Sequence, residues 1–102
     1  MMTTEQVAVI VDRDLEDLIP GFMERRRQDV AALRNCLACG DLEKIRICGH
    51  SMKGTGGGYG FDEISTIGGD IEQAAIDGEN DRISELTDRL EKYLEQVVIT
   101  FE

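Results

Sequence analysis

The chain has 102 residues, which is enough for one domain and too few for two. Its hydrophobic fraction of 41% can form a core, and this core must be largely aliphatic because only 5% of the residues are aromatic. With 11 basic against 21 acidic residues the net charge is −10, which disfavours nucleic acid and anionic membranes as partners and favours a partner with a basic docking surface.

No window of the sequence holds the roughly 20 apolar residues of a membrane span. Residues 1–12 lack the basic region that begins a secretory signal peptide, so we expect a cytoplasmic protein. Cysteines in that compartment are normally reduced, and we expect no disulfide among the three in this chain.

Two short apolar, β-branched runs lie near the ends of the chain, at residues 7–11 and 97–101. Each run is too short to predict a helix by itself. Three interpretations stay open: the runs pair as a small ribbon, they pack as extended tails, or the second run prolongs the last helix.

The first predicted helical segments lie on either side of Pro20-Gly21. Asp12 or Asp14 is suited to cap a short helix, and Pro20 should break or kink the chain after it. A long helix is expected to follow, with the charged residues 24–29 on its solvated side. Its apolar stripe consists of Phe22, Met23, Val30, Leu33 and Leu37.

Gly40 is suited to end this long helix, and Asp41 to cap the next one, which we expect from Leu42 to about Gly57. At about 100° per residue, one side of this second helix is apolar or small and should be buried. The buried side comprises Leu42, Ile45, Cys48, Gly49, Met52 and Thr55. The opposite side comprises Glu43, Arg46, His50, Lys53, Gly54 and Gly57.

Two further amphipathic helices complete the pattern. Asp62 should cap the third helix and Gly78 should end it, and Asn80 or Asp81 should cap the fourth. The third stripe, rich in small residues that should allow close packing against the second helix, is Ile64, Ile67, Gly68, Ile71, Ala74 and Ala75. The fourth stripe is Ile83, Leu86, Leu90, Leu94 and Val97.

Helices of this length with short links predict an all-α protein, an antiparallel four-helix bundle with a short additional N-terminal helix. The expected division is a single domain over residues 1–102. The bundle should occupy residues 14–98 approximately, with tails at residues 1–11 and 99–102.

His50 is the only histidine of the chain. Histidine is the one side chain whose ordinary pKa leaves a neutral, nucleophilic ring nitrogen available near pH 7. Lys53 follows one turn later and could neutralise phosphoryl oxygens. Gly54 and Gly57 leave bare backbone beside the ring, although each glycine inside a helix costs roughly 0.5–1 kcal/mol relative to alanine. The close approach of another molecule would explain them.

The segment around His50 resembles the signature of the histidine phosphotransfer (HPt) family, His-x-hydrophobic-Lys-Gly with a further Gly downstream. The matching positions are His50, Met52, Lys53, Gly54 and Gly60. The flanks are similar as well: Gly40-Asp41 before the histidine helix, Phe61 at the start of the next helix, and Glu72-x-Ala74-Ala75 within it. The resemblance extends from about Leu15 to Tyr93.

This resemblance implies a stand-alone phosphocarrier of a two-component phosphorelay, without kinase activity of its own. Nε2 of His50 would accept a phosphoryl group from a receiver aspartate, with Lys53 neutralising its charge. Gly54, Gly57, Arg46 and Ile47 would form the receiver-docking face. The chain would bind no cofactor, because the receiver would supply Mg²⁺. Response-regulator receivers, and a hybrid histidine kinase as a further candidate, would be the partners of a monomeric protein.

Two other functions stay open. The chain could be a helical adaptor that binds a receiver or kinase without carrying phosphate. It could also be a zinc or redox sensor based on Cys36-x-x-Cys39, although one such pair is a weak signal. Zinc binding by His50 together with Cys48 is disfavoured because the two side chains project about 160° apart on one helix. We therefore expect no metal site.

Overall fold

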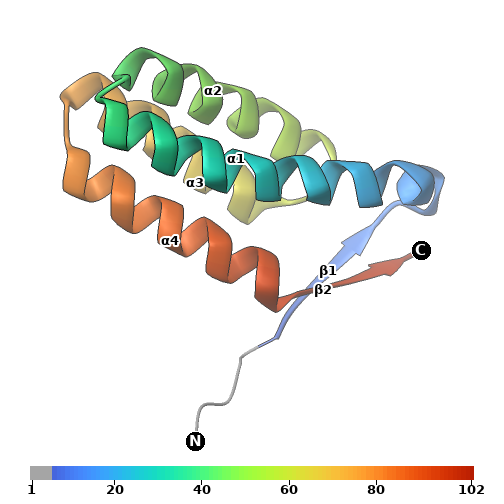
Figure 1. Cartoon of the computed structure of the whole chain (residues 1–102). Coiled ribbons are helices and arrows are strands. Elements are labelled where there is room, and N and C mark those ends of the chain that lie inside the picture. The colour runs from blue at the N-terminus through green and yellow to red at the C-terminus, as the bar shows by residue number, and fades with distance from the viewer. Residues whose placement is uncertain (1–5) are drawn as a thin grey trace, which may run out of the picture.

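Four antiparallel helices and a small strand ribbon make up the computed structural model, which describes residues 6–102 (Figure 1). The helices are α1 (Ile19–Cys39), α2 (Leu42–Gly58), α3 (Asp62–Asp77) and α4 (Asn80–Gln96). A short 3₁₀ helix (Arg13–Leu18) precedes α1, and the strands are β1 (Val7–Val11) and β2 (Val97–Phe101). The predicted helical bundle with a short additional N-terminal helix is confirmed.

The corner between α1 and α2 has the chemistry expected from the sequence. Gly40 adopts the left-handed conformation with φ 73°, and its N–H donates to the carbonyl groups of Cys36 and Leu37. The Asp41 side chain accepts a hydrogen bond from the backbone N–H of Lys44 and so caps α2. Gly78 ends α3 with a φ of 70°. These three predicted helix boundaries are confirmed.

Other predicted boundaries are wrong. Pro20 lies in the first turn of α1 and does not break the chain, because the backbone N–H that proline lacks has no helical partner in that turn. Phe61 and Glu79 occupy the N-cap positions of α3 and α4, and neither forms a side-chain capping bond. Asp62 and Asn80 are the first residues inside their helices, where a carboxylate or polar group still suits the helix dipole.

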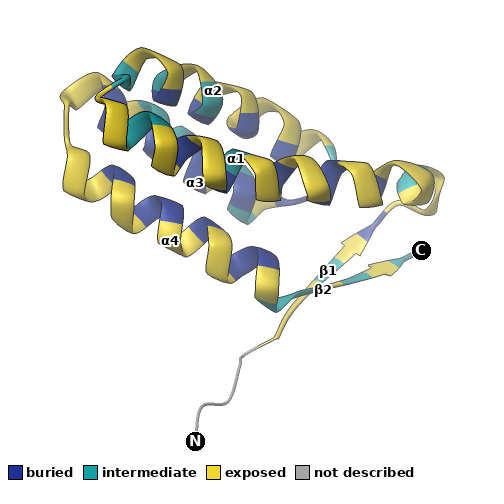
Figure 2. Ribbon diagram, viewed as in Figure 1, coloured by how far each residue is buried: buried dark blue, intermediate teal, exposed yellow. Residues whose placement is uncertain are grey.

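The core lies between the inner faces of the four helices (Figure 2). The third stripe is buried throughout, and the first and fourth are buried except for half-buried Leu37 and Val97. On α2, Leu42 and Cys48 are half-buried, and the prediction is wrong for Thr55, which is exposed while the neighbouring Gly56 is buried. Gly56 takes that place because α3 comes so close that a Cβ there would lie 2.7 Å from the backbone nitrogen of Ser65.

Arg26 is buried, although residues 24–29 were expected on the solvated side of α1. Its Nε lies 2.8 Å from Oδ2 of Asp29, and its Nη1 donates to Oγ1 of Thr55 at 2.8 Å. Its guanidinium carbon lies 4.9 Å from the ring centroid of Phe22. A carboxylate, a hydroxyl and an aromatic face thus compensate the charge, which makes the burial of an arginine tolerable.

The two terminal runs pair as parallel strands, from Val7 opposite Val97 to Val11 opposite Phe101. Of the three interpretations left open, pairing as a ribbon is therefore the observed one. The first strand lies in the expected N-terminal tail. The second strand begins at residues 97 and 98, which were expected in the last helix, and continues into the expected C-terminal tail. The helix ends at Gln96, and not near residue 98, because the backbone becomes extended at Val97 with ψ 131°. The pairing continues beyond the strands, since the Arg13 N–H donates to the Glu102 carbonyl at 3.0 Å.

Ile71 offers a test of the core. Its side chain is fully buried on α3, with 0% exposed, so the Ile71→Ala variant should lose about 2–5 kcal/mol of unfolding free energy. Urea denaturation followed by circular dichroism measures this loss. Ile76→Ala is the matched control, because Ile76 lies on the same helix and is 59% exposed. Its unfolding free energy should change by no more than about 0.5 kcal/mol, and equal effects of the two variants would contradict the fold.

Candidate functional site

His50 projects from the middle of α2 into solvent, with 69% of its side chain exposed. Its Nδ1 lies 2.9 Å from Oε2 of Glu72, a residue of α3. Within residues 6–102, Nε2 forms no hydrogen bond. The ring is therefore held at one nitrogen and open to an approaching molecule at the other.

Glu72 contacts both His50 and Lys53, the two candidate site residues of α2. Its side chain is 17% exposed, and its second oxygen, Oε1, lies 3.8 Å from Nζ of Lys53. A carboxylate oxygen accepts hydrogen bonds, so this contact favours the His50 tautomer with its proton on Nδ1 and its lone pair on Nε2. The contact with Glu72 thus favours the form of the ring in which Nε2 is the free nitrogen.

Glu72 is part of the flanking resemblance to the HPt family but was not predicted from the sequence to lie in the site. The contact joins residues 22 positions apart, a separation that helical periodicity alone cannot relate. The available signal was its position one turn after Gly68, on the edge of the α3 stripe that was expected to pack closely against α2.

The space around the backbone of Gly54 and Gly57 is open. A Cβ added at Gly54 would meet no atom within 4 Å, and one added at Gly57 would meet only Oγ of Ser65, at 3.7 Å. Lys53 is 57% exposed, so its ammonium can reach a group bound to the ring. The structure therefore brings together His50, Lys53 and the two glycines on one accessible face.

Arg46 and Ile47 lie about one turn before His50, and within the described residues only the first of them has a side-chain partner. Arg46 forms two hydrogen bonds with Glu43, at 2.9 and 2.7 Å, and these bonds lower the pKa of the Glu43 carboxyl. Ile47 is 53% exposed and, together with Ser51, lines a groove of about 320 Å³ between α1 and α2. Arg46 is thus already paired, whereas Ile47 offers an unpartnered apolar surface.

The three cysteines are free thiols. Cys48 is half-buried beside Asp29, and burial raises the pKa of its thiol to about 12, so it stays protonated near neutral pH. Cys36 is half-buried and Cys39 is exposed. Over the described part of the chain, no group of three or more His, Cys, Asp or Glu side chains is placed to hold a metal ion.

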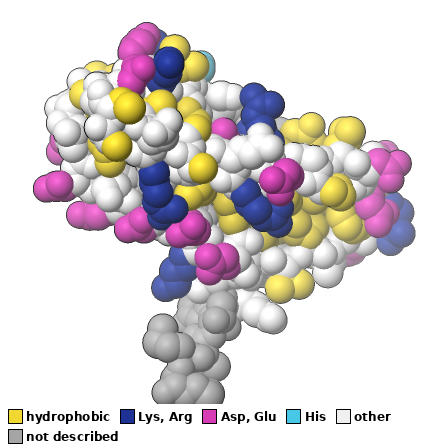
Figure 3. Space-filling model, in the orientation of Figure 1, with side chains coloured by type: hydrophobic (Ala, Val, Ile, Leu, Met, Phe, Trp, Pro, Cys, Tyr) yellow, Lys and Arg dark blue, Asp and Glu magenta, His cyan; other side chains and the backbone are white. Residues whose placement is uncertain are grey.

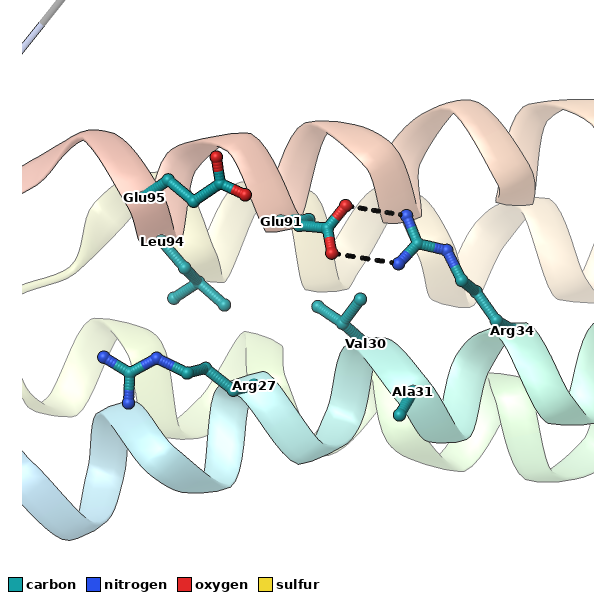
Figure 4. Close-up of a pocket in the computed structure, with 7 residues that line it drawn as sticks. All are labelled: Arg27, Val30, Ala31, Arg34, Glu91, Leu94 and Glu95. Atoms are coloured by element: carbon teal, nitrogen blue, oxygen red, sulfur yellow. Dashed lines mark hydrogen bonds and ion pairs between the residues drawn. The ribbon is translucent and has the colours of Figure 1, made fainter. Parts of the chain in front are cut away.

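Another groove, of about 420 Å³, lies between α1 and α4 (Figure 4). Arg34 reaches across it to both carboxylate oxygens of Glu91, at 3.1 Å each, while Val30 and Leu94 form its floor. Acidic, basic and apolar side chains are mixed on the face seen in Figure 3. None of the groove's lining residues belongs to α2 or α3, so it is separate from the His50 site.

Among residues 6–102, no helix is both long enough and apolar enough to cross a membrane.

Comparison with known proteins agrees with this geometry. The family model described as Hpt domain matches residues 17–99, a span that contains all four helices and His50. No curated protein matched the chain, and no solved structure did. The matched span covers most of the chain and confirms the resemblance seen in the motif around His50. The chain belongs to the Hpt domain family.

Proposed function

We propose that this protein is a stand-alone histidine phosphotransfer protein, which relays a phosphoryl group between receiver-domain aspartates through His50. Hpt domains serve histidine phosphotransfer in phosphorelays and are phosphocarriers and not kinases. The observation that carries the proposal is the open Nε2 of His50, on a ring whose Nδ1 is held by Glu72 at 2.9 Å.

The transfer step follows from this arrangement. The Nε2 lone pair attacks the phosphorus of an aspartyl phosphate, an N–P bond forms, and the P–O bond to the aspartate breaks with release of its carboxylate. The phosphorylated ring keeps the Nδ1 proton and becomes cationic. Glu72, which already accepts that proton's hydrogen bond, stabilises the positive charge.

Lys53 contributes charge neutralisation. Its contact with Glu72 is long, at 3.8 Å, and both groups are reachable from solvent, so the ammonium can turn toward arriving phosphoryl oxygens at little cost. Phosphoryl transfer depends mainly on positioning and charge neutralisation, so a site of this simplicity is sufficient. The receiver would supply Mg²⁺ within its own acidic pocket.

The proposal includes a cellular setting. The protein would act as a monomer in the cytoplasm, with response-regulator receivers as partners and a hybrid histidine kinase as a further candidate. Its net charge of −10 favours a partner surface that carries basic side chains around the acidic pocket. The exposed Ile47 and the bare backbone at Gly54 would lie within the docking face.

Incubation with a radiolabelled, phosphorylated receiver domain and Mg²⁺ tests the proposal. The label should move to this protein and behave as phosphohistidine, labile in acid and stable in base. Profiling against the receivers of the source organism would identify the partner. Stable binding to a receiver without any uptake of label would contradict phosphate carriage and would instead fit the adaptor function.

Glu72→Ala should slow phosphoryl uptake by about tenfold to a hundredfold, because it removes the group that orients the ring and stabilises its charge. Rapid-quench kinetics with a phosphorylated receiver measures the rate. Glu63→Ala is the matched control, since Glu63 lies on the same helix but pairs with Arg89 of α4, at 2.8 Å, and not with His50. A Glu72→Ala variant as fast as Glu63→Ala would contradict the assigned role.

A further inference from the structure

Two glycines bring the backbones of α2 and α3 into direct contact at the level of the His50 site. A Cβ added at Gly49 would lie 2.7 Å from both the Glu72 nitrogen and the Gly68 carbonyl oxygen. A Cβ added at Gly68 would lie 2.6 Å from the Lys53 nitrogen and 2.8 Å from the Gly49 carbonyl oxygen. Real side chains essentially never come this close, so a methyl group at either position would push the helices apart.

The residues touched by this glycine contact are those of the site. Gly49 is the residue before His50 and lies against the backbone of Glu72, and Gly68 lies against the backbone of Lys53. The atoms concerned belong to the backbone, which cannot rotate away as the end of a side chain can. The spacing of the two helices at this level is therefore set by the absence of both Cβ atoms.

We propose that Gly49 and Gly68 are positioning residues of the phosphotransfer site: their contact sets the separation of α2 and α3 at which Glu72 holds Nδ1 and leaves Nε2 as the nucleophile. The effect of this contact on phosphotransfer rests on the proposed function, whereas the contact itself does not. The Nδ1 to Oε2 distance is 2.9 Å, and N–H···O hydrogen bonds in proteins span about 2.7–3.2 Å. A displacement of several tenths of an ångström is enough to lose the tautomer preference.

Two other glycines provide controls, one for strain between the two helices and one for the change from glycine to alanine. Gly56 makes an equally close contact between the same helices, 2.7 Å from the Ser65 nitrogen, but touches no residue of the site. Gly69 is the neighbour of Gly68, and a Cβ there would make only ordinary contact with the Lys53 side chain, at 3.5 Å. Gly56→Ala thus reproduces the strain, and Gly69→Ala reproduces the chemical change without strain.

The experiment compares Gly49→Ala and Gly68→Ala with these two controls. The ¹⁵N chemical shifts of the neutral His50 ring report which nitrogen carries the proton. Phosphoramidate is a small phosphate donor that releases ammonia as the Nε2–P bond forms. The rate of phosphate uptake from it reports the reactivity of Nε2 without any receiver. Circular dichroism and thermal melting report the fold.

Gly49→Ala and Gly68→Ala should shift the ring toward the form protonated on Nε2 and slow uptake from phosphoramidate by about tenfold to a hundredfold. Both controls should keep the wild-type tautomer, with Gly56→Ala melting at a lower temperature. Unchanged tautomers in the two test variants would overturn the proposal. A tautomer shift of equal size in Gly56→Ala would also overturn it. The same holds if both test variants are unfolded while Gly56→Ala is folded, because the contact would then serve the fold alone.

A shifted tautomer in a protein whose wild type takes up no phosphate would support the positioning role and refute the proposed function. The two inferences therefore fail separately.

Discussion

Replacing His50 by glutamine should abolish the acid-labile, base-stable label that the protein acquires from a phosphorylated receiver. The amide nitrogen of glutamine has no available lone pair, and the chain has no second histidine that could take over. The loss should therefore be complete and not partial. Autoradiography of the two proteins after incubation with the same phosphorylated receiver measures it.

The fold should survive this substitution. The His50 side chain is 69% exposed, and substitutions at exposed positions usually change the unfolding free energy by no more than about 0.5 kcal/mol. The helical circular dichroism and the melting temperature should match those of the wild type, and the variant should still bind the receiver. Label that persists in His50→Gln would exclude His50 as the phosphoacceptor.

Gly54→Glu should slow phosphoryl transfer from a receiver by about a hundredfold or more. A side chain at this position would stand on the face by which the partner must approach His50, and its carboxylate would repel the incoming phosphoryl group. Phosphotransfer kinetics with a single receiver measures the loss. Because a Cβ at Gly54 meets no atom within 4 Å, the variant should fold, and better helix propensity should add roughly 0.5 kcal/mol of stability.

Two controls separate the possible causes. Gly58→Glu places the same side chain on the same helix, again with no atom within 4 Å of its Cβ but two turns beyond His50, and it should transfer at close to the wild-type rate. Gly54→Gln keeps the bulk of the glutamate without its charge. If Gly54→Gln slows transfer less than Gly54→Glu does, the difference between the two rates measures the charge repulsion. A Gly54→Glu protein that transfers as fast as Gly58→Glu would refute close approach at this position.

Local patterns in the sequence were sufficient to predict the helices and the exposed face of α2. The six positions of the α3 stripe repeat at helical spacing, and all of them are buried. The Gly40-Asp41 corner was predictable because a left-handed glycine and a capping aspartate depend only on the residues next to them. His50 could be placed in solvent because the residues that form the core of α2 lie on the opposite side of that helix.

Features that depend on distant residues could not be decided in the same way. The ribbon pairs Val7 with Val97, and neither run shows by itself that the other will lie beside it. Arg26 looked solvated because one of its partners, Thr55, belongs to α2 and lies beside it only after α1 and α2 pack together. Glu72 was missed as a member of the site for the same reason, since its contact with His50 exists only between folded helices.

We propose that Nε2 of His50 is the atom that carries phosphate. ¹⁵N and ³¹P NMR of the uniformly ¹⁵N-labelled protein, phosphorylated by its receiver, locates the N–P bond directly through the coupling between the two nuclei. We predict a single phosphohistidine at residue 50, with phosphorus coupled to Nε2 and the proton retained on Nδ1. Phosphorus coupled to Nδ1, or phosphate found on any other residue, would contradict this assignment.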